Sequence, residues 1–136
     1  MIFIDSNIWC YFFDESAKEH KSVVDFLTKA LEKEKIVMNT LVIMEISHYL
    51  IKNLGPINGR EKIKRFLEFP FVVEDFNYEM LLDSVSYLSR YSHTGIGGRD
   101  ASILATMKKS NIKKIITHDK DFKKIDFVEI IDPIKS

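Results

Sequence analysis

The feature that most constrains the fold is an alternation between short apolar runs and longer segments of helical periodicity. The runs have the length of buried strands and cover residues 1–4, 36–39, 71–76, 113–119 and 127–131. Between them, apolar side chains recur every three or four positions, a spacing typical of amphipathic helices. Alternating strands and helices predict an α/β fold: a three-layer α/β/α sandwich with helices on both faces of a central, mainly parallel sheet.

Polar and glycine residues mark the ends of several predicted helices. Thr40 is the predicted N-cap of a helix over residues 41–53, which Gly55 and Pro56 should end. Asn77 is the predicted N-cap of a later helix. A glycine-rich loop, HTGIGG, precedes the helix that begins RDASILATM.

Length and composition indicate one ordinary globular domain, which we place at residues 1–136. A chain of 136 residues is of single-domain size, and 46% hydrophobic with 29% charged residues excludes the disordered class. The single cysteine, Cys10, excludes an intramolecular disulfide. We see neither a signal peptide nor an apolar run of the roughly 20 residues that span a bilayer, so we expect a cytoplasmic protein without membrane contact.

The charge distribution gives only local support for a nucleic-acid ligand. The formal net charge is zero, whereas nucleic-acid-binding domains are usually basic. Lysines are concentrated in residues 108–124, and a second basic group covers residues 60–65. The simplest interpretation of either group alone is a solvated helix face.

Two acidic residues follow predicted strands. Asp5 comes directly after the apolar run 1–4, and Asp119 ends the run 113–119. A buried carboxylate costs several kcal/mol unless it is paired, neutralised or bound to a metal. In open parallel sheets, ligands bind outside the carboxyl ends of the strands, where the strand order reverses. We therefore expect Asp5 and Asp119 to meet at one edge of the sheet.

Two further acids are candidates by position. Glu45 lies early in an otherwise apolar helix, and the alternative to a role in a site is a glutamate on the protein surface. Asp100 opens the helix after the glycine-rich loop, and its charge there also complements the helix dipole. Four clustered carboxylates repel one another without a cation, and oxygen ligands suit Mg²⁺, for which Mn²⁺ can substitute. Metal-held water can attack a phosphodiester, so this chemistry favours a phosphodiesterase.

Four stretches of the sequence carry a family resemblance. FIDSN, NTLVIMEI, GGRDASILATM and IITHDKDF resemble the four acidic motifs of PIN-domain ribonucleases, most nearly the VapC-like toxins of prokaryotic toxin–antitoxin pairs. The resemblance covers nearly the whole chain. It implies a PIN-like fold. It also implies that the acids which bind metal and catalyse the reaction are Asp5, Glu45, Asp100 and Asp119. Two polar neighbours, Asn7 and Thr117, are implied to support these acids.

The resemblance also implies an activity and partners. It implies a magnesium-dependent endoribonuclease that cleaves RNA, works as a homodimer and is silenced by an antitoxin protein, for example through a basic side chain placed among the carboxylates. Asp121 competes with Asp119 as the fourth acid, because both lie in the motif HDKDF. Two alternatives stay open: a housekeeping RNA-processing PIN nuclease, and a non-catalytic PIN module that binds RNA or protein.

Overall fold

The computed structural model describes residues 1–134, which form one parallel β-sheet flanked by helices. The strand order is β3-β2-β1-β4-β5. The strands are β1 (Ile2–Ile4), β2 (Ile36–Asn39), β3 (Val72–Glu74), β4 (Lys114–Ile116) and β5 (Glu129–Ile131). All four neighbouring pairs are parallel. β1 therefore lies at the centre, and the strand order reverses beside it.

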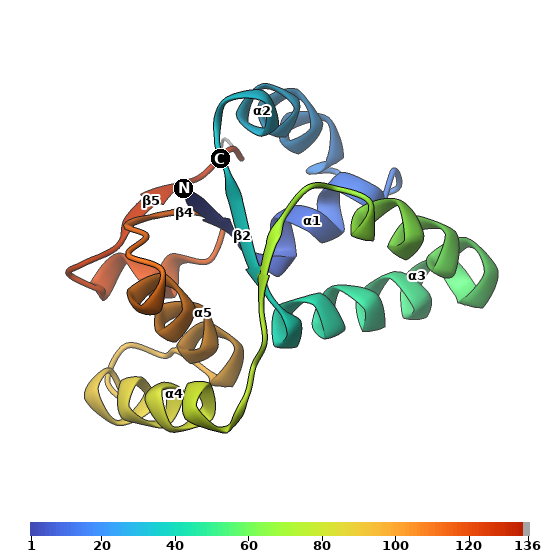
Figure 1. The fold of residues 1–136 in the computed structure, drawn as a ribbon. Coiled ribbons are helices and arrows are strands. Elements are labelled where there is room, and N and C mark those ends of the chain that lie inside the picture. Colours follow the sequence, from blue (N-terminus) through green and yellow to red (C-terminus); the bar gives the residue numbers. More distant parts are fainter. Residues whose placement is uncertain (135–136) are drawn as a thin grey trace.

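Helices cover both faces of the sheet, which confirms the predicted three-layer α/β/α sandwich (Figure 1). The elements are α1 (Ser6–Phe13), α2 (His20–Lys33), α3 (Thr40–Leu67), α4 (Tyr78–Arg90), α5 (Gly98–Lys109) and the short 3-10 helix η1 (Lys120–Lys124). The order of the strands explains the arrangement. From β1 through β2 to β3 the chain adds strands toward one edge of the sheet, and from β3 it returns past β1 to add β4 and β5 at the other edge. Right-handed crossovers therefore place α1, α2 and α3 on one face of the sheet and α4 and α5 on the other.

An aromatic cluster packs α1 against the end of α3 and the segment that enters β3. Trp9 is fully buried and packs on Phe66 and Phe71, with ring centroids 4.9 and 5.3 Å away. Burying one such side chain stabilises the fold by roughly 1.5–3 kcal/mol. Cys10 of the same helix is also buried and is 6% exposed. The packing of α1 matters for function because Asp5 immediately precedes this helix.

The N-cap prediction for α3 was wrong by one residue. Asn39, at the end of β2, has extended backbone angles, and its Oδ1 accepts a hydrogen bond of 2.8 Å from the Val42 amide. The helix consequently begins at Thr40. Thr40 Oγ1 instead accepts a 2.8 Å hydrogen bond from the Phe76 amide and so tethers the segment that enters α4.

The predicted break at Gly55 is present, although the helix resumes directly after it. Gly55 has φ 86°, a left-handed conformation that favours glycine. The second part of α3 then turns back on the first, as Figure 1 shows. A Cβ atom at Gly59 would lie 2.7 Å from the Ile51 Cα, so this close approach requires glycine. Within residues 1–134, no helix is both long and apolar enough to cross a membrane.

Candidate active site

Asp5 is held at the carboxyl end of the central strand. Its amide donates to the Ile116 carbonyl of β4, and its Oδ1 caps α1 by accepting from the Ser6 amide at 2.7 Å. Thr117 Oγ1 donates to the other carboxylate oxygen at 2.8 Å. The side chain is fully buried. Burial raises the pKa of Asp5 to about 6, although the nearby Arg99 and the Thr117 hydrogen bond oppose the increase.

Asp119 follows β4 and is linked to Asp5 through Thr117. The Asp119 amide donates to Thr117 Oγ1 at 3.0 Å, so one hydroxyl bridges the two acidic positions. Asp119 Oδ1 also accepts from the Asp121 amide at 2.9 Å and caps η1. The Asp121 side chain lies elsewhere, against Gly95: a Cβ atom there would be 3.2 Å from Asp121 Oδ1. Of the two competing acids, the structure thus places Asp119 beside Asp5.

Asp100 lies in the first turn of α5 and is buried. Its Oδ2 accepts from the Gly97 amide at 3.2 Å, so it also satisfies an otherwise unpaired group at the helix start. Asn39 Nδ2 donates to Thr106 Oγ1 at 3.0 Å and ties α5 to the end of β2. The role of Asp100 at the start of the helix is therefore compatible with a role in an acid cluster.

Three of the four predicted acids converge. Asp5, Asp100 and Asp119 each offer one oxygen, and these atoms all lie within 4.8 Å of one another. Glu45 lies beside this group: its Oε2 is 3.4 Å from Ser6 Oγ, which in turn is 3.4 Å from Asp5 Oδ1. The Glu45 side chain is 48% exposed. We use the term acid cluster for these four residues.

Sequence reasoning missed Arg99, which contacts all four acids. Its Nη2 lies 2.8 Å from Asp100 Oδ1 and 3.1 Å from Asp119 Oδ2. Its Nε lies 3.5 Å from Asp5 Oδ1 and 3.6 Å from Glu45 Oε2. Burial lowers the pKa of Arg99, but the neighbouring carboxylates outweigh burial and raise it above its usual value. The sequence held one signal for Arg99. A cation in the first turn of a helix opposes the helix dipole, so its presence there indicates a favourable contact elsewhere, such as with acidic side chains.

A small hollow adjoins the acid cluster between α1 and α3. Its volume is about 250 Å³, and its lining residues are Ser6, Asn7, Cys10, Tyr11, Glu45, Tyr49 and Arg99. The Oδ1 atom of Asn7 is buried and has no hydrogen-bond partner within residues 1–134. Of the two polar neighbours predicted to support the acids, Thr117 therefore contacts them directly, whereas Asn7 faces the hollow.

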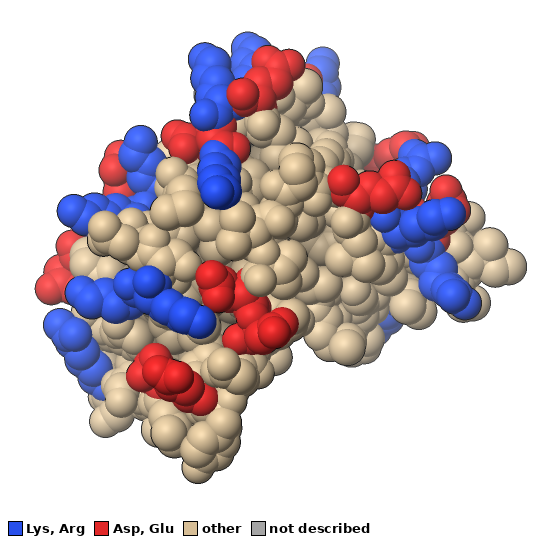
Figure 2. Space-filling view, viewed as in Figure 1, with Lys and Arg blue, Asp and Glu red and all other residues tan. Residues whose placement is uncertain are grey.

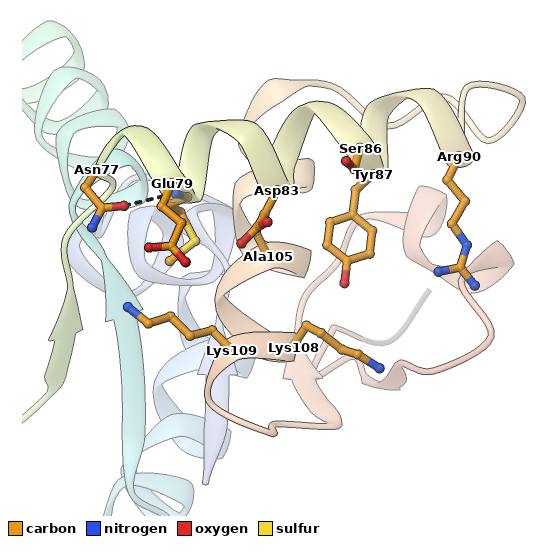
Figure 3. A pocket seen from close by; sticks show the side chains of 10 residues that line it. Asn77, Glu79, Asp83, Ser86, Tyr87, Arg90, Ala105, Lys108 and Lys109 are labelled. Carbon is orange, nitrogen blue, oxygen red and sulfur yellow. Dashed lines mark hydrogen bonds between the residues drawn. The ribbon is translucent and has the colours of Figure 1, made fainter.

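A larger groove of about 400 Å³ lies between α4 and α5, away from the acid cluster. Figure 3 shows Glu79 and Asp83 of α4 opposite Lys108 and Lys109 of α5. Both lysines are in the last turn of α5, whereas Asp100 is in the first turn. Because acidic side chains of α4 face basic side chains of α5 across this groove, it does not offer the uniformly positive surface that phosphates favour.

The chain is similar to known proteins in sequence and in fold. The chain is 32% identical to ribonuclease VapC2 of Methanocaldococcus jannaschii, with 96% of the chain and 93% of that protein aligned. Its fold matches that of VapC20 of Mycobacterium tuberculosis, a toxin that cleaves the sarcin–ricin loop, with a TM-score of 0.82 at 21% identity. That match covers 95% of this chain and 98% of the other.

A second solved structure with the same fold is a VapBC complex with DNA. It is VapBC2 of Rickettsia felis bound to a DNA fragment of the promoter, with a TM-score of 0.76, 19% identity, and coverage of 97% and 98% of the two chains. The sequence itself matches the PIN domain family over residues 2–128. The chain therefore belongs to the PIN domain family, within its VapC branch.

Proposed function

We propose that this chain is a divalent-metal-dependent endoribonuclease and the toxin of a toxin–antitoxin pair. One observation carries the proposal: three carboxylates from three separate elements present oxygens within 4.8 Å at the carboxyl edge of the sheet. That edge is where open parallel sheets bind ligands. The relationship to a named ribonuclease at 32% identity supports the choice of RNA as the substrate.

The donor set fits a hard divalent cation. Mg²⁺ prefers oxygen ligands, so three clustered carboxylates suit it, and Mn²⁺ has similar preferences. We assign the direct contacts to Asp5, Asp100 and Asp119. When bound, such an ion activates water and stabilises the charge that develops on the phosphate. Glu45 is the most exposed of the four acids, and we assign its Oε2 to accept a proton from the attacking water.

The decisive test compares two neighbouring aspartates. Asp119→Asn should reduce magnesium-dependent RNA cleavage by at least about a hundredfold, because it weakens metal capture. Asp121→Asn is the matched control, since its side chain lies against Gly95, and it should retain activity within a few fold. EDTA should abolish the wild-type activity. If Asp119→Asn cleaves RNA at the wild-type rate in Mg²⁺, Asp119 does not belong to the proposed metal site.

The RNA contacts should be local rather than spread over one basic face. Figure 2 shows Lys and Arg side chains interspersed with Asp and Glu over the visible surface. Several basic groups are paired, such as Lys109 with Glu74 at 3.3 Å and Arg65 with Glu61 at 3.7 Å. We therefore propose that selectivity depends on the hollow beside the acid cluster, where Tyr11 and Asn7 can meet a base near the cleaved phosphate.

The toxin assignment requires an antitoxin. The comparison with a VapBC complex supports a protein partner that silences the nuclease. Expression of this chain alone should arrest growth, and co-expression with the adjacent small gene should restore growth and give a stable complex. If growth continues normally and RNA is still cleaved, a housekeeping RNA-processing nuclease is the better assignment. RNA binding without cleavage would favour the non-catalytic module.

We also propose that the protein is a homodimer. Helix α4 exposes an apolar stripe at helical spacing: Tyr78, Leu81, Leu82 and Val85 are 41–73% exposed. Such a stripe suits a self-complementary contact between two copies. Leu82→Glu should shift the protein to a monomer in analytical ultracentrifugation, whereas an unchanged dimer would place the interface elsewhere.

A further inference from the structure

The chain supplies its own cation to the acid cluster. Among the ion pairs of residues 1–134, Arg99 is the basic side chain that reaches these acids, and its guanidinium lies within 3.6 Å of all four. The four acids come from four different places in the sequence, whereas Arg99 immediately precedes one of them, Asp100. A single turn of α5 therefore carries both an acid of the cluster and its counter-charge.

The acids explain the position of Arg99 better than the helix does. The start of a helix carries a partial positive charge and disfavours a cation. The side chain is nevertheless only 27% exposed, so three quarters of it is withdrawn from water. Carboxylates held together repel one another, and a guanidinium with several donors in one plane relieves that repulsion at several oxygens at once.

The guanidinium and a metal ion would need the same carboxylates. Arg99 contacts Asp5, Asp100 and Asp119, which are the three residues whose oxygens lie within 4.8 Å of one another. Two cations in one partly buried space repel strongly, so full coordination of a metal and full contact by Arg99 oppose each other. We propose that Arg99 is a tethered counter-cation that exchanges with the divalent ion at the acid cluster.

Two properties follow from such an exchange, which rests on the metal site of the proposed function. Without metal, Arg99 holds the cluster together and stabilises the fold. With metal, the protein must first give up these contacts, so Arg99 weakens apparent metal affinity and sets the concentration at which the site fills. The residue is thus a regulator of metal loading rather than a ligand.

The test measures metal affinity and stability without RNA, so its outcome is independent of whether the chain cleaves RNA. Arg99→Gln should bind Mn²⁺ at least about tenfold more tightly in isothermal titration calorimetry, because the competing charge is gone. Its melting temperature in EDTA should fall by several degrees, and saturating Mn²⁺ should raise it by more than it raises the wild type.

Two further variants separate the exchange from general effects. Arg60→Gln removes the same charge from an exposed position and should change Mn²⁺ affinity less than about twofold. Arg99→Lys keeps the charge without the planar fork, so its affinity should lie between those of the wild type and Arg99→Gln. The proposal is overturned if folded Arg99→Gln binds Mn²⁺ as the wild type does, or more weakly, or if its stability in EDTA is unchanged.

Discussion

Helix α1 has a buried aspartate at each end, and the two are held in opposite ways. Asp5 caps its N-terminus and Asp14 its C-terminus, and the two residues are 0% and 5% exposed. Asp14 accepts hydrogen bonds from the Ser16 amide, the Ser16 hydroxyl and Tyr49 Oη. Burial favours its neutral form, but these donors outweigh burial, so the pKa of Asp14 lies below the usual 3.8.

At Asp5 the balance is reversed. The Ser6 amide and Thr117 hydroxyl also donate to it, yet burial dominates and its pKa is raised to about 6. Asp5 further lies beside Asp100, a second carboxylate that opposes its charge. The fold therefore stabilises the charge on Asp14 with its own donors, whereas it leaves the charge on Asp5 dependent on a cation. The first arrangement is typical of a structural carboxylate and the second of a functional one.

The largest expected difference between the two aspartates is in RNA cleavage. Asp5→Asn keeps the side-chain shape but removes a negative charge from the proposed metal site, so activity should fall by orders of magnitude. Asp14→Asn should cleave within a few fold of the wild type when both are measured below their melting temperatures. If the two substitutions reduce the rate equally, the distinction between a structural and a functional aspartate is wrong.

The next effect is a dependence of stability on pH between about pH 4 and 6, which we expect from Asp5 and not from Asp14. The folded pKa of Asp5, about 6, exceeds the reference value of 3.8, so the folded state binds more protons in this range. Stability of the metal-free protein should then decrease as pH rises, by roughly 3 kcal/mol in total. Urea unfolding in EDTA should show this slope for the wild type but not for Asp5→Asn.

Asp14 should show the opposite sign in a different range. Its folded pKa is lowered, so its contribution to stability is complete above the reference value of 3.8 and is lost as pH falls below it. The wild type and Asp14→Asn should therefore converge in stability only at acid pH. Parallel unfolding curves for the wild type and Asp5→Asn from pH 4 to 7 would contradict the burial-driven shift at Asp5.

The comparison also indicates what the sequence could reveal. The alternation of apolar runs predicted the sheet and its layers, because the burial of parallel strands on both faces leaves a strong local pattern. Asp5 was conspicuous for the same reason, since it directly follows such a run. The motifs identified the family, and the structure brings three of their four acids together.

The missed features depend on contacts between distant segments. Thr40 and Asn39 are both good N-caps, and only the end of β2 decides between them. Arg99 meets Asp5, Glu45 and Asp119 through tertiary packing, which no local spacing encodes. Asp14 is similar, because its donor Tyr49 lies 35 residues away. Local pattern predicts where an element begins and which face is buried, but not which charges will face one another.

Asp14→Asn should affect stability more than activity. It removes the charge that three donors were arranged to meet, so the free energy of unfolding at neutral pH should fall by roughly 1–3 kcal/mol. Asp5→Asn in metal-free buffer should be as stable as the wild type or more so, because it relieves repulsion within the acid cluster. Urea denaturation of both variants in EDTA measures the contrast, and a larger loss at Asp5 would reverse our interpretation.

The smallest expected effect isolates a single donor to Asp14. Tyr49→Phe removes the 3.0 Å hydrogen bond from Tyr49 Oη while the two Ser16 donors stay, so stability should fall by about 1 kcal/mol. Tyr11 and Tyr49 both line the hollow beside the acid cluster. Tyr11→Phe is the matched control, because the Tyr11 hydroxyl makes no hydrogen bond within residues 1–134. In the Asp14→Asn background, Tyr49→Phe should cost less, since the charged acceptor is already gone. Full additivity of the two substitutions in a double-mutant cycle would mean that Tyr49 stabilises the fold by packing and not through Asp14.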